Sequence, residues 1–169
     1  LQKERVAIIG GGPAGLSAAY QLRKMGYAST IFEERKELGG MMRYGIPGYR
    51  TPRDLLDKEI ERIINLGDIE IVLGKRVGKD VKLEDVEKSH DAVLWTIGCW
   101  NGKAIPVDGG DATNCITGVD FLEAFCDGRL KVGSKKVICV GGGDTSIDVV
   151  SVARRLGHIS KMNEQDTPE

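Results

Sequence analysis

Blocks of apolar residues separated by polar or glycine-rich stretches predict the order of secondary-structure elements. Apolar runs typical of strands lie at Val6–Ile9, Thr30–Phe32, Ile69–Leu73 and Ala92–Ile97, the last expected to be buried. Apolar residues at helical spacing predict helices after Gly15, from Thr51 to Leu66, and over Leu83–Lys88. Strands that alternate with helices in this way indicate an α/β fold with a mostly parallel sheet covered by helices.

The first strand runs into a glycine pattern that is typical of dinucleotide-binding βαβ units. Gly10 permits a tight turn, Gly12 lets the backbone approach a pyrophosphate, and Gly15 lets the helix pack closely on the sheet. The helix N-terminus then offers N–H groups and a positive dipole to the phosphates. Glu33 lies 18 residues after Gly15, close to the spacing of about 20 expected for an acid that binds a ribose hydroxyl. A glycine-rich turn without a ligand is the alternative, but strand, helix and acid together favour a nucleotide site.

A long, weakly charged loop follows the second strand. It contains Leu38, the pair Gly39 and Gly40, and the run Met41–Tyr49, which is interrupted by Pro47. Paired glycines permit close approach to a ligand, and long loops of this kind are more often functional than idle. The alternative is a buried structural loop. Further along, Gly74–Val77 is expected to run along the edge of the same sheet.

A second glycine turn lies about 130 residues after the first. Lys136–Val140 is predicted to be a strand, and Gly141, Gly142 and Gly143 lead into a helix in which Ser146 stands at the third glycine position. Serine is small enough for a close helix contact, so the phosphate turn is expected to survive. An ordinary turn from strand to helix is the alternative. Two such turns in one chain suit FAD and a nicotinamide nucleotide.

The stretch between the two glycine turns carries a domain boundary in this interpretation. Residues 102–118 are rich in glycine and aspartate, as linkers often are, and Thr117 with Asp120 predicts a capped helix over Val119–Phe125. We therefore expect residues 1–108 to be the N-terminal segment of an FAD-binding domain. Residues 109–169 are expected to be part of an NAD(P)-binding domain.

Composition and charge exclude several classes of function. The net charge is −1 and the apolar content 41%, which gives no case for nucleic acid or a charged membrane surface. No apolar run reaches the length of about 20 residues that a membrane span needs. The four cysteines show no metal or dithiol spacing, so they predict small buried apolar residues, no metal site and a cytoplasmic location.

The motifs together resemble the glutamate synthase small-subunit family, and the flavin half of dihydropyrimidine dehydrogenase is similar. The resemblance rests on residues 10–15, on the strand end 31–34, on Gly39-Gly40 followed by residues 44–47, and on residues 141–148. It covers nearly the whole chain, to about Gly157. The combination is specific to a group of FAD- and NAD(P)-dependent oxidoreductases.

The resemblance implies two sets of binding residues and a reaction. The FAD set comprises Gly10, Gly12, Pro13, Ala14, Gly15, Glu33, Glu34, Gly40, Met41, Arg50, Val77 and Gly98. The nicotinamide nucleotide set comprises Gly141, Gly143, Asp144, Thr145 and Ser146. Within the first set Arg50 can neutralise a pyrophosphate oxygen, and Val77 can flank an adenine from a strand. Hydride is expected to pass from NAD(P)H to FAD, with electrons continuing to an iron–sulfur domain or partner subunit and no catalytic side chain required.

Departures from the family pattern set the remaining alternatives. Thr96-Ile97-Gly98 stands where the family commonly has Ala-Thr-Gly, so a hydroxyl is missing or displaced, and 108–111 differs from the usual turn. The iron–sulfur cysteines and the segment that returns to the FAD domain are absent, which indicates a piece of a longer protein or a short subunit completed by a partner. Other functions left open are a binding module without turnover and a flavin oxidase or monooxygenase.

Overall fold

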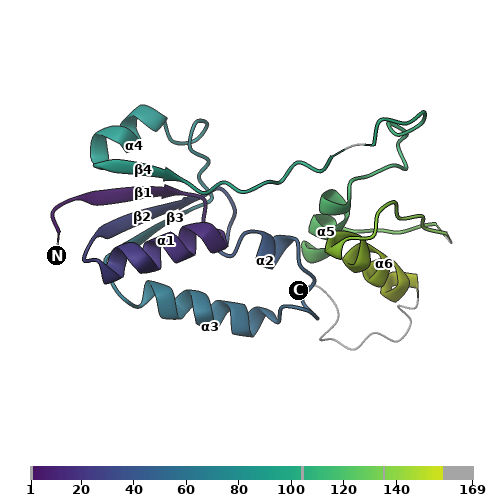
Figure 1. Ribbon diagram of the computed structural model, residues 1–169, viewed down its shortest axis with the longest axis horizontal. Coiled ribbons are helices and arrows are strands. Elements are labelled where there is room, and N and C mark those ends of the chain that lie inside the picture. Colours follow the sequence, from purple (N-terminus) through teal and green to yellow (C-terminus); the bar gives the residue numbers. More distant parts are fainter. Residues whose placement is uncertain (1, 104, 135, 158–169) are drawn as a thin grey trace. The chain divides into compact units, whose positions relative to one another are not determined.

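The chain folds into two compact units in the computed structural model, which describes residues 2–103, 105–134 and 136–157 (Figure 1). Over the described residues, the first unit comprises 2–42 and 53–98, and the second comprises 43–52 and 99–157. Residues 43–52 therefore belong to the second unit, although the sequence of the first unit surrounds them. The boundary expected after residue 108 stays a prediction.

A four-stranded parallel sheet forms the centre of the first unit. Its strands are β1 (Arg5–Ile9), β2 (Ala28–Glu33), β3 (Ile69–Leu73) and β4 (Ala92–Trp95), in the order β3-β2-β1-β4. In the register, Ile8 of β1 lies beside Ile31 of β2 and Leu94 of β4. Parallel strands need crossover connections, which here are helices and loops. The predicted α/β class is confirmed.

Helices cover both faces of this sheet. Helices α1 (Pro13–Lys24) and α3 (Arg53–Ile64) lie on one face, and α4 (Leu83–Ser89) lies on the other (Figure 1). The core under α1 and α3 is aliphatic and contains Ile8, Leu16, Ala19, Ile31, Leu38, Leu56, Ile60, Ile63 and Ile69. Ala7 and Ile9, which point to the opposite face, pack against Val86 of α4. Alternation along β1 thus divides its side chains between two cores. Leu55 of α3 and Leu66, which follows the helix, are exposed, although helical spacing predicts both on its apolar face.

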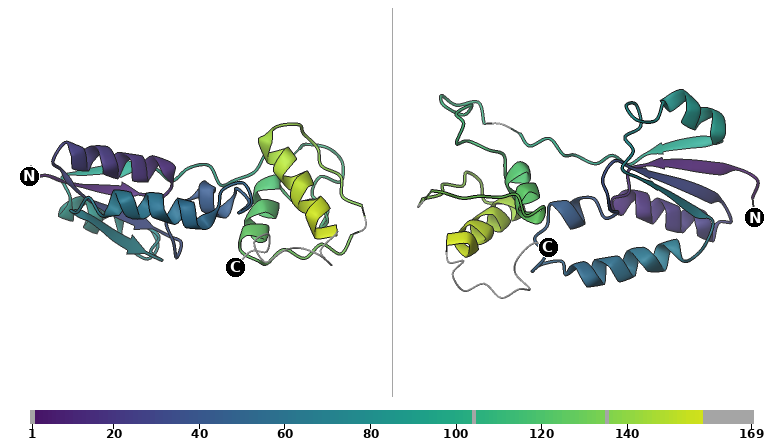
Figure 2. Two further views of the ribbon diagram at one scale, coloured as in Figure 1. Left: turned by 90° about the horizontal axis from the view of Figure 1, so that it is seen from below. Right: turned by 180° about the vertical axis from the view of Figure 1, so that it is seen from behind.

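The second unit is built around two helices. Helix α5 (Gly118–Cys126) and α6 (Asp144–Gly157) lie side by side (Figure 2) and enclose a core of Phe121, Leu122, Phe125, Val149 and Val152. The Thr117 side chain accepts a hydrogen bond of 3.2 Å from the Asp120 N–H, so the predicted cap is confirmed. The short helix α2 (Met41–Tyr44) lies where the chain passes from the first unit into the second.

The strand predicted at Lys136–Val140 is wrong. These residues have no regular secondary structure, and Val137, Ile138 and Val140 are exposed. A strand is stable only with neighbours that accept its backbone hydrogen bonds, and all four strands of the described residues lie in the first unit. The apolar pattern of residues 136–140 predicts a strand, but no described strand of the second unit is there to pair with it.

Two further expectations about strands are corrected. The strand at Ala92 ends at Trp95 and is not buried, because it lies at the edge of the described sheet and only Val93 packs into a core. Val77 is not on a strand that runs along the sheet. The backbone N–H groups of Gly74 and Lys75 still donate to the carbonyl oxygens of Arg35 and Glu33, but Val77 forms only an isolated bridge with Val81.

The described residues contain neither a membrane-spanning helix nor a cluster of metal-binding side chains. Within residues 2–103, 105–134 and 136–157, no helix is long and apolar enough to cross a membrane. The same residues contain no cluster of three or more side chains suited to hold a metal ion. Cys99 and Cys115 are exposed, which corrects the expectation that all four cysteines are buried.

Candidate functional site

The first glycine turn lies at the carboxyl end of β1, next to the point where the strand order reverses. From β1 the chain continues to β2 and β3 on one side of β1, and it then returns to β4 on the other side. In open α/β sheets, ligands bind outside the carboxyl ends of the strands at such a switch point. The fold therefore places residues 10–15 where a nucleotide site is expected.

Close packing explains the first and last glycines of this turn. Gly10 has a φ of 111°, and a Cβ there would lie 2.5 Å from the carbonyl oxygen of Thr96. A Cβ on Gly15 would lie 2.0 Å from the carbonyl oxygen of Gly10. Neither position has room for a side chain. The turn and the start of α1 are thus held against each other and against the end of β4.

The Thr96 side chain locks the same turn. Its Oγ1 lies 2.8 Å from the carbonyl oxygen of Gly10 and 3.0 Å from that of Ile9, and the hydroxyl donates to them. The Thr96 backbone N–H also donates to Ile9, at 2.8 Å. Thr96 stands one position before the threonine of the family's usual Ala-Thr-Gly. Its hydroxyl fixes the glycine turn.

The N-terminus of α1 is open to a ligand. Gly12 is the N-cap and has no side-chain cap, Pro13 is the first helical residue, and Pro13 and Ala14 are exposed. The first N–H groups of a helix have no partner within the helix. A Cβ on Gly12 would meet Gly40 at 3.6 Å, an ordinary contact, so crowding by the protein does not require glycine here. Close approach of a ligand to the backbone would explain why position 12 is a glycine.

Glu33 is buried at the end of β2 and is held by the backbone. Its Oε2 accepts a hydrogen bond of 2.7 Å from the Gly11 N–H, and its Oε1 accepts one of 2.9 Å from the Arg35 N–H. Each carboxylate oxygen can accept more than one hydrogen bond. The carboxylate thus positions the glycine turn and keeps capacity for the ribose hydroxyl that the sequence predicts.

The loop at Leu38–Gly40 closes on the glycine turn. Leu38, Gly39 and Gly40 are buried, and the Gly39 N–H donates to the carbonyl oxygen of Gly11 at 2.8 Å. Gly40 has a φ of 51°, and a Cβ there would lie 2.7 Å from the Cα of Gly12. The close approach expected of this glycine pair is therefore made to the protein's own backbone, as in the structural alternative considered for this loop.

The other residues of the predicted FAD set lie around this centre or outside it. Glu34 is exposed and forms an ion pair with Arg76 at 3.3 Å; Met41 is half-buried in α2. Gly98 follows β4 and is exposed. Val77 packs with the core under α4. The structure brings Gly10–Gly15, Glu33 and Gly40 together. The flavin contacts of all twelve residues of the set stay predictions.

Arg50 lies in the second unit and binds an acid of α6. Its Nη1 donates to both Asp148 oxygens, each at 2.7 Å, and the Asp148 side chain is 7% exposed. The hydrogen bond and the charge of Asp148 raise the pKa of Arg50. The predicted contact between Arg50 and a flavin pyrophosphate stays a prediction, but the sequence offered no sign of this ion pair.

In the second glycine turn, the first glycine lies against the side chain at the third glycine position. Gly141 has a φ of 127°, and a Cβ there would lie 2.7 Å from the Ser146 Oγ. Gly141, Gly143, Asp144 and Thr145 are exposed, and the Ile147 N–H donates to the carbonyl oxygen of Gly143 at 3.1 Å. Ser146 thus fills the third glycine position in contact with the first. Of the five predicted residues, Gly141 and Gly143 lie just before α6, and Asp144, Thr145 and Ser146 form its first turn.

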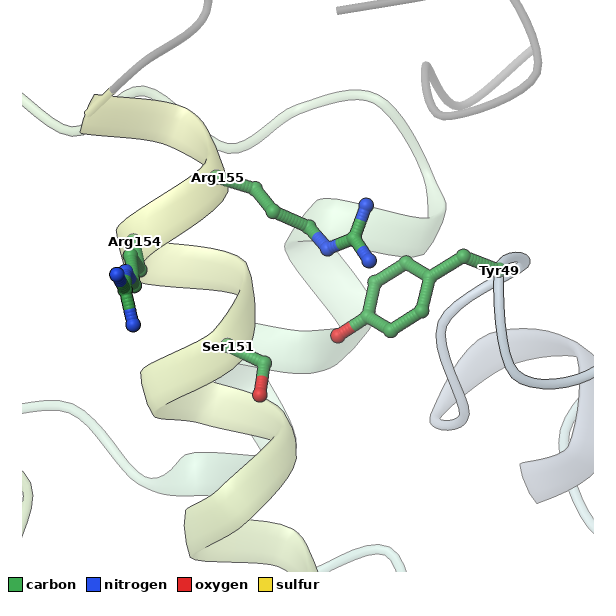
Figure 3. Close-up of a pocket in the computed structure, with 4 residues that line it drawn as sticks. All are labelled: Tyr49, Ser151, Arg154 and Arg155. Carbon is green, nitrogen blue, oxygen red and sulfur yellow. The ribbon is translucent and has the colours of Figure 1, made fainter.

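An open pocket lies beside the middle of α6. Tyr49, Ser151, Arg154 and Arg155 line it, and the Tyr49 ring faces the helix (Figure 3). The Arg155 guanidinium lies 3.8 Å from the centre of that ring, a cation–π contact. Burial raises the pKa of the Tyr49 hydroxyl, and the nearby Asp148 carboxylate adds to the rise.

Similarity to known proteins agrees with this geometry. The model of the family described as "Pyridine nucleotide-disulphide oxidoreductase" matches residues 4–165. The β subunit of an NADPH-Fe(3+) oxidoreductase from Geobacter sulfurreducens is 43% identical over 161 residues, which are 92% of this chain and 24% of that protein. The NAD-dependent dihydropyrimidine dehydrogenase subunit PreT of Salmonella typhimurium is 39% identical over 90% of this chain and 37% of its own length.

Two more similarities concern the expected family and the fold. The glutamate synthase [NADPH] small chain of Azospirillum brasilense is 32% identical over 92% of this chain and 34% of its own length. FprA from Mycobacterium tuberculosis, solved in complex with NADPH, has a TM-score of 0.68 at 22% identity, over 73% of this chain and 29% of that chain. This last likeness concerns the fold alone.

The matched stretch is 24% to 37% of the length of these relatives. The relatives include the two kinds of protein that the motifs resemble, so that expectation is confirmed. Because the family model matches residues 4–165 of its 169 residues, the chain belongs to the pyridine nucleotide-disulphide oxidoreductase family.

Proposed function

We propose that this chain is the nucleotide-binding part of an FAD-dependent oxidoreductase that takes hydride from NAD(P)H and passes electrons to an iron–sulfur or partner-subunit acceptor. The observation that carries the proposal is the open N-terminus of α1 beside the sheet's switch point, where Gly12 leaves the first N–H groups without a side-chain cap. That arrangement suits a pyrophosphate. The names of the relatives, which include NADPH- and NAD-dependent enzymes, support the same reading.

The residues present fit the ADP part of FAD. Pro13 and Ala14 are exposed at the helix N-terminus, and a Cβ on Gly12 would make only an ordinary contact with Gly40. Glu33 is fixed by two backbone N–H groups, so its carboxylate is oriented before any ribose arrives. Preorganised groups bind more tightly because little conformational freedom is lost on binding. Gly10–Gly15 and Glu33 would hold this half of the cofactor.

The second turn fits the pyrophosphate of a nicotinamide nucleotide. Residues 141–145 are exposed, Ser146 is half-buried, and the helix of 14 residues begins at Asp144. Bound flavin would supply hydride acceptance and single-electron transfer, while the chain's own residues bind and orient the two nucleotides. We also propose the cytoplasm as the location, which the motifs and the cysteines suggested.

Flavin content and reduction test this function. The full-length protein that contains this chain is purified, its bound flavin is released and identified, and the protein is then mixed with NADPH or NADH without oxygen. We expect FAD at about one per chain and bleaching of the flavin absorbance by at least one of the two nucleotides. Protein without flavin would contradict the proposal. Bleaching that survives Gly143→Glu unchanged would place the nicotinamide site elsewhere.

A further inference from the structure

The pocket beside α6 has basic and hydroxyl side chains on its walls and no acid. Its lining residues are Tyr49, Ser151, Arg154 and Arg155 (Figure 3). Its volume of about 390 Å³ lies within the range of small-molecule sites, about 300–1,000 Å³. Ser151 is three and four residues before the two arginines, so the three side chains leave neighbouring positions of one helix. The pocket lies about two helical turns beyond the second glycine turn.

Arg155 is held over the Tyr49 ring, with its guanidinium carbon 3.8 Å from the ring centre. A stacked guanidinium contacts the ring with its flat face, whereas its N–H donors lie in the plane and point outward. Stacking therefore fixes the position of this cation and is compatible with donation to the oxygens of an anion.

Arg154 is a second cation at the edge of the same pocket. It is exposed, and none of the residues that the structure describes forms an ion pair or hydrogen bond with it. Figure 3 shows its side chain turned away from Tyr49. Rotation about the side-chain bonds, which costs little at an exposed position, would bring the guanidinium to an anion beside Ser151.

The charges around the pocket leave a positive excess. Among the described residues that line it or act on the Tyr49 hydroxyl, Arg50, Arg154 and Arg155 are positive and Asp148 is negative. The net side-chain charge is therefore +2. The C-terminal end of α6 offsets about half an elementary charge of it. The two arginines at this end thus do more than balance the helix dipole.

The Tyr49 hydroxyl gives a second reason to expect a ligand. Its oxygen is buried and has no hydrogen-bond partner in the described part of the chain. Ser151 is close enough to act on the pKa of Tyr49, but the two hydroxyls do not form a hydrogen bond. A serine hydroxyl that donates to an anion keeps its lone pairs for another donor. An anion that turns Ser151 toward itself would thus let Ser151 accept from the buried phenol.

We propose that this pocket binds a phosphate group through the guanidinium groups of Arg154 and Arg155 and the hydroxyl of Ser151. Phosphate suits the pocket better than a carboxylate, because a phosphate monoester carries about −1.5 to −2 charges at pH 7 and offers three acceptor oxygens to three donor side chains. The planar fork of arginine also matches phosphate geometry. The site is separate from both glycine turns, and it does not depend on the proposed function.

Calorimetry on the full-length protein that contains this chain tests the site and separates two sources of the phosphate group. Inorganic phosphate and glycerol 3-phosphate are titrated separately in a phosphate-free buffer, with acetate for comparison. We expect at least one phosphate to bind with a dissociation constant of about 1 mM or tighter, and acetate to bind at least about tenfold more weakly. Tighter binding of glycerol 3-phosphate would identify an organic phosphate as the ligand. Equal or tighter binding of inorganic phosphate would identify the free ion.

Variants of the pocket then locate the bound phosphate. Arg154→Gln breaks no contact with a described residue, so it should fold as the wild type does and bind phosphate at least about tenfold more weakly, as for loss of one charge-assisted hydrogen bond. Ser151→Ala should weaken binding at least about threefold. Arg129→Gln is the matched control, because Arg129 is an exposed arginine of the same unit that pairs with Asp127 at 2.8 Å. It should bind phosphate within about threefold of wild type.

Three outcomes would overturn the inference. The first is a wild-type protein that shows no saturable binding of either phosphate. The second is equal affinity in the wild type and Arg154→Gln, which would place the phosphate at another site, such as a glycine turn. The third is an equal loss in Arg129→Gln, which would mean that overall positive charge attracts the ion. Flavin content and flavin reduction, which test the proposed function, are measured independently of all three.

Discussion

The carboxylate of Glu33 accepts a hydrogen bond of 2.7 Å from the backbone N–H of Gly11, which is 22 residues earlier in the chain. This bond joins the end of β2 to the glycine turn after β1. Glu33 therefore has a structural role that does not depend on a bound nucleotide. Its two roles can be separated by measuring stability and flavin binding on the same variants.

Replacement of Glu33 is expected to lower stability as well as flavin binding. Glu33→Ala removes both hydrogen bonds and leaves the Gly11 N–H without its partner in a buried place, which costs about 2–4 kcal/mol of unfolding free energy. Urea unfolding of the flavin-free protein measures this. Glu61→Ala, an exposed acid of α3, is the control and should change stability by less than about 0.5 kcal/mol. Equal stability of the two variants would contradict the structural role.

Gly15→Ala is expected to disrupt the packing of α1 on the sheet. The added Cβ would lie 2.0 Å from the carbonyl oxygen of Gly10, so the backbone must shift, and we expect a loss of about 3 kcal/mol or more. Gly48→Ala serves as the control, because nothing lies within 4 Å of a Cβ there. A thermal unfolding midpoint equal to that of the control would show that the turn relaxes without cost.

Unlike Gly15→Ala, the variant Gly12→Ala is expected to lose flavin binding but little stability. Its Cβ would make only an ordinary contact of 3.6 Å with Gly40, so stability should stay within about 1 kcal/mol of wild type. The same methyl group would occupy the space beside the α1 N-terminus, so flavin content should fall strongly. Normal flavin content in Gly12→Ala would argue that the pyrophosphate lies elsewhere.

The Thr96 hydroxyl provides a test of the turn that leaves its glycines intact. Thr96→Val keeps the shape of the side chain and removes the hydrogen bonds to the Ile9 and Gly10 carbonyls, at an expected cost of about 1–3 kcal/mol. Thr96→Ser keeps the hydroxyl and should lose less. Chemical denaturation of both variants measures the difference. Wild-type stability of Thr96→Val beside a loss in Thr96→Ser would mean that the methyl group matters and the hydroxyl does not.

Stability should depend on pH through Tyr49 in the alkaline range. Burial raises the pKa of its hydroxyl above 10.0, so the folded chain favours the neutral phenol. This contribution is complete below the pKa of the unfolded chain and is lost as the pH rises through the folded pKa. We therefore expect the unfolding free energy of the wild type to fall, relative to Tyr49→Phe, as the pH rises above about 10. Parallel curves for the two proteins would contradict this.

The first unit could be predicted from the sequence in most respects, because its signals are local. Strand β3 matches its predicted limits, Ile69–Leu73, and the glycine spacing at 10, 12 and 15 located the turn correctly. Helical spacing and capping residues depend on neighbours within a few positions, so one sequence carries them. The same holds for the Thr117 cap of α5.

The errors concern features that depend on distant partners. Residues 136–140 have a strand-like pattern but no strand to pair with among the described residues, and the exposure of Leu94 and Trp95 follows from the position of β4 at the sheet edge. The bond between Arg50 and Asp148 joins positions 98 residues apart. No periodicity or motif reports such a pair, so Arg50 was assigned from the resemblance alone.

The membership of residues 43–52 in the second unit has a consequence for synthesis on the ribosome. This segment, with Pro47 and Tyr49 among its packed residues, is made before α5 and α6, against which it packs. The second unit therefore cannot complete its core until residue 157 or so has emerged, however early the βαβ start of the first unit folds. Contacts this distant in sequence slow folding, and premature release of the chain would leave Tyr49 and its neighbours without their helix.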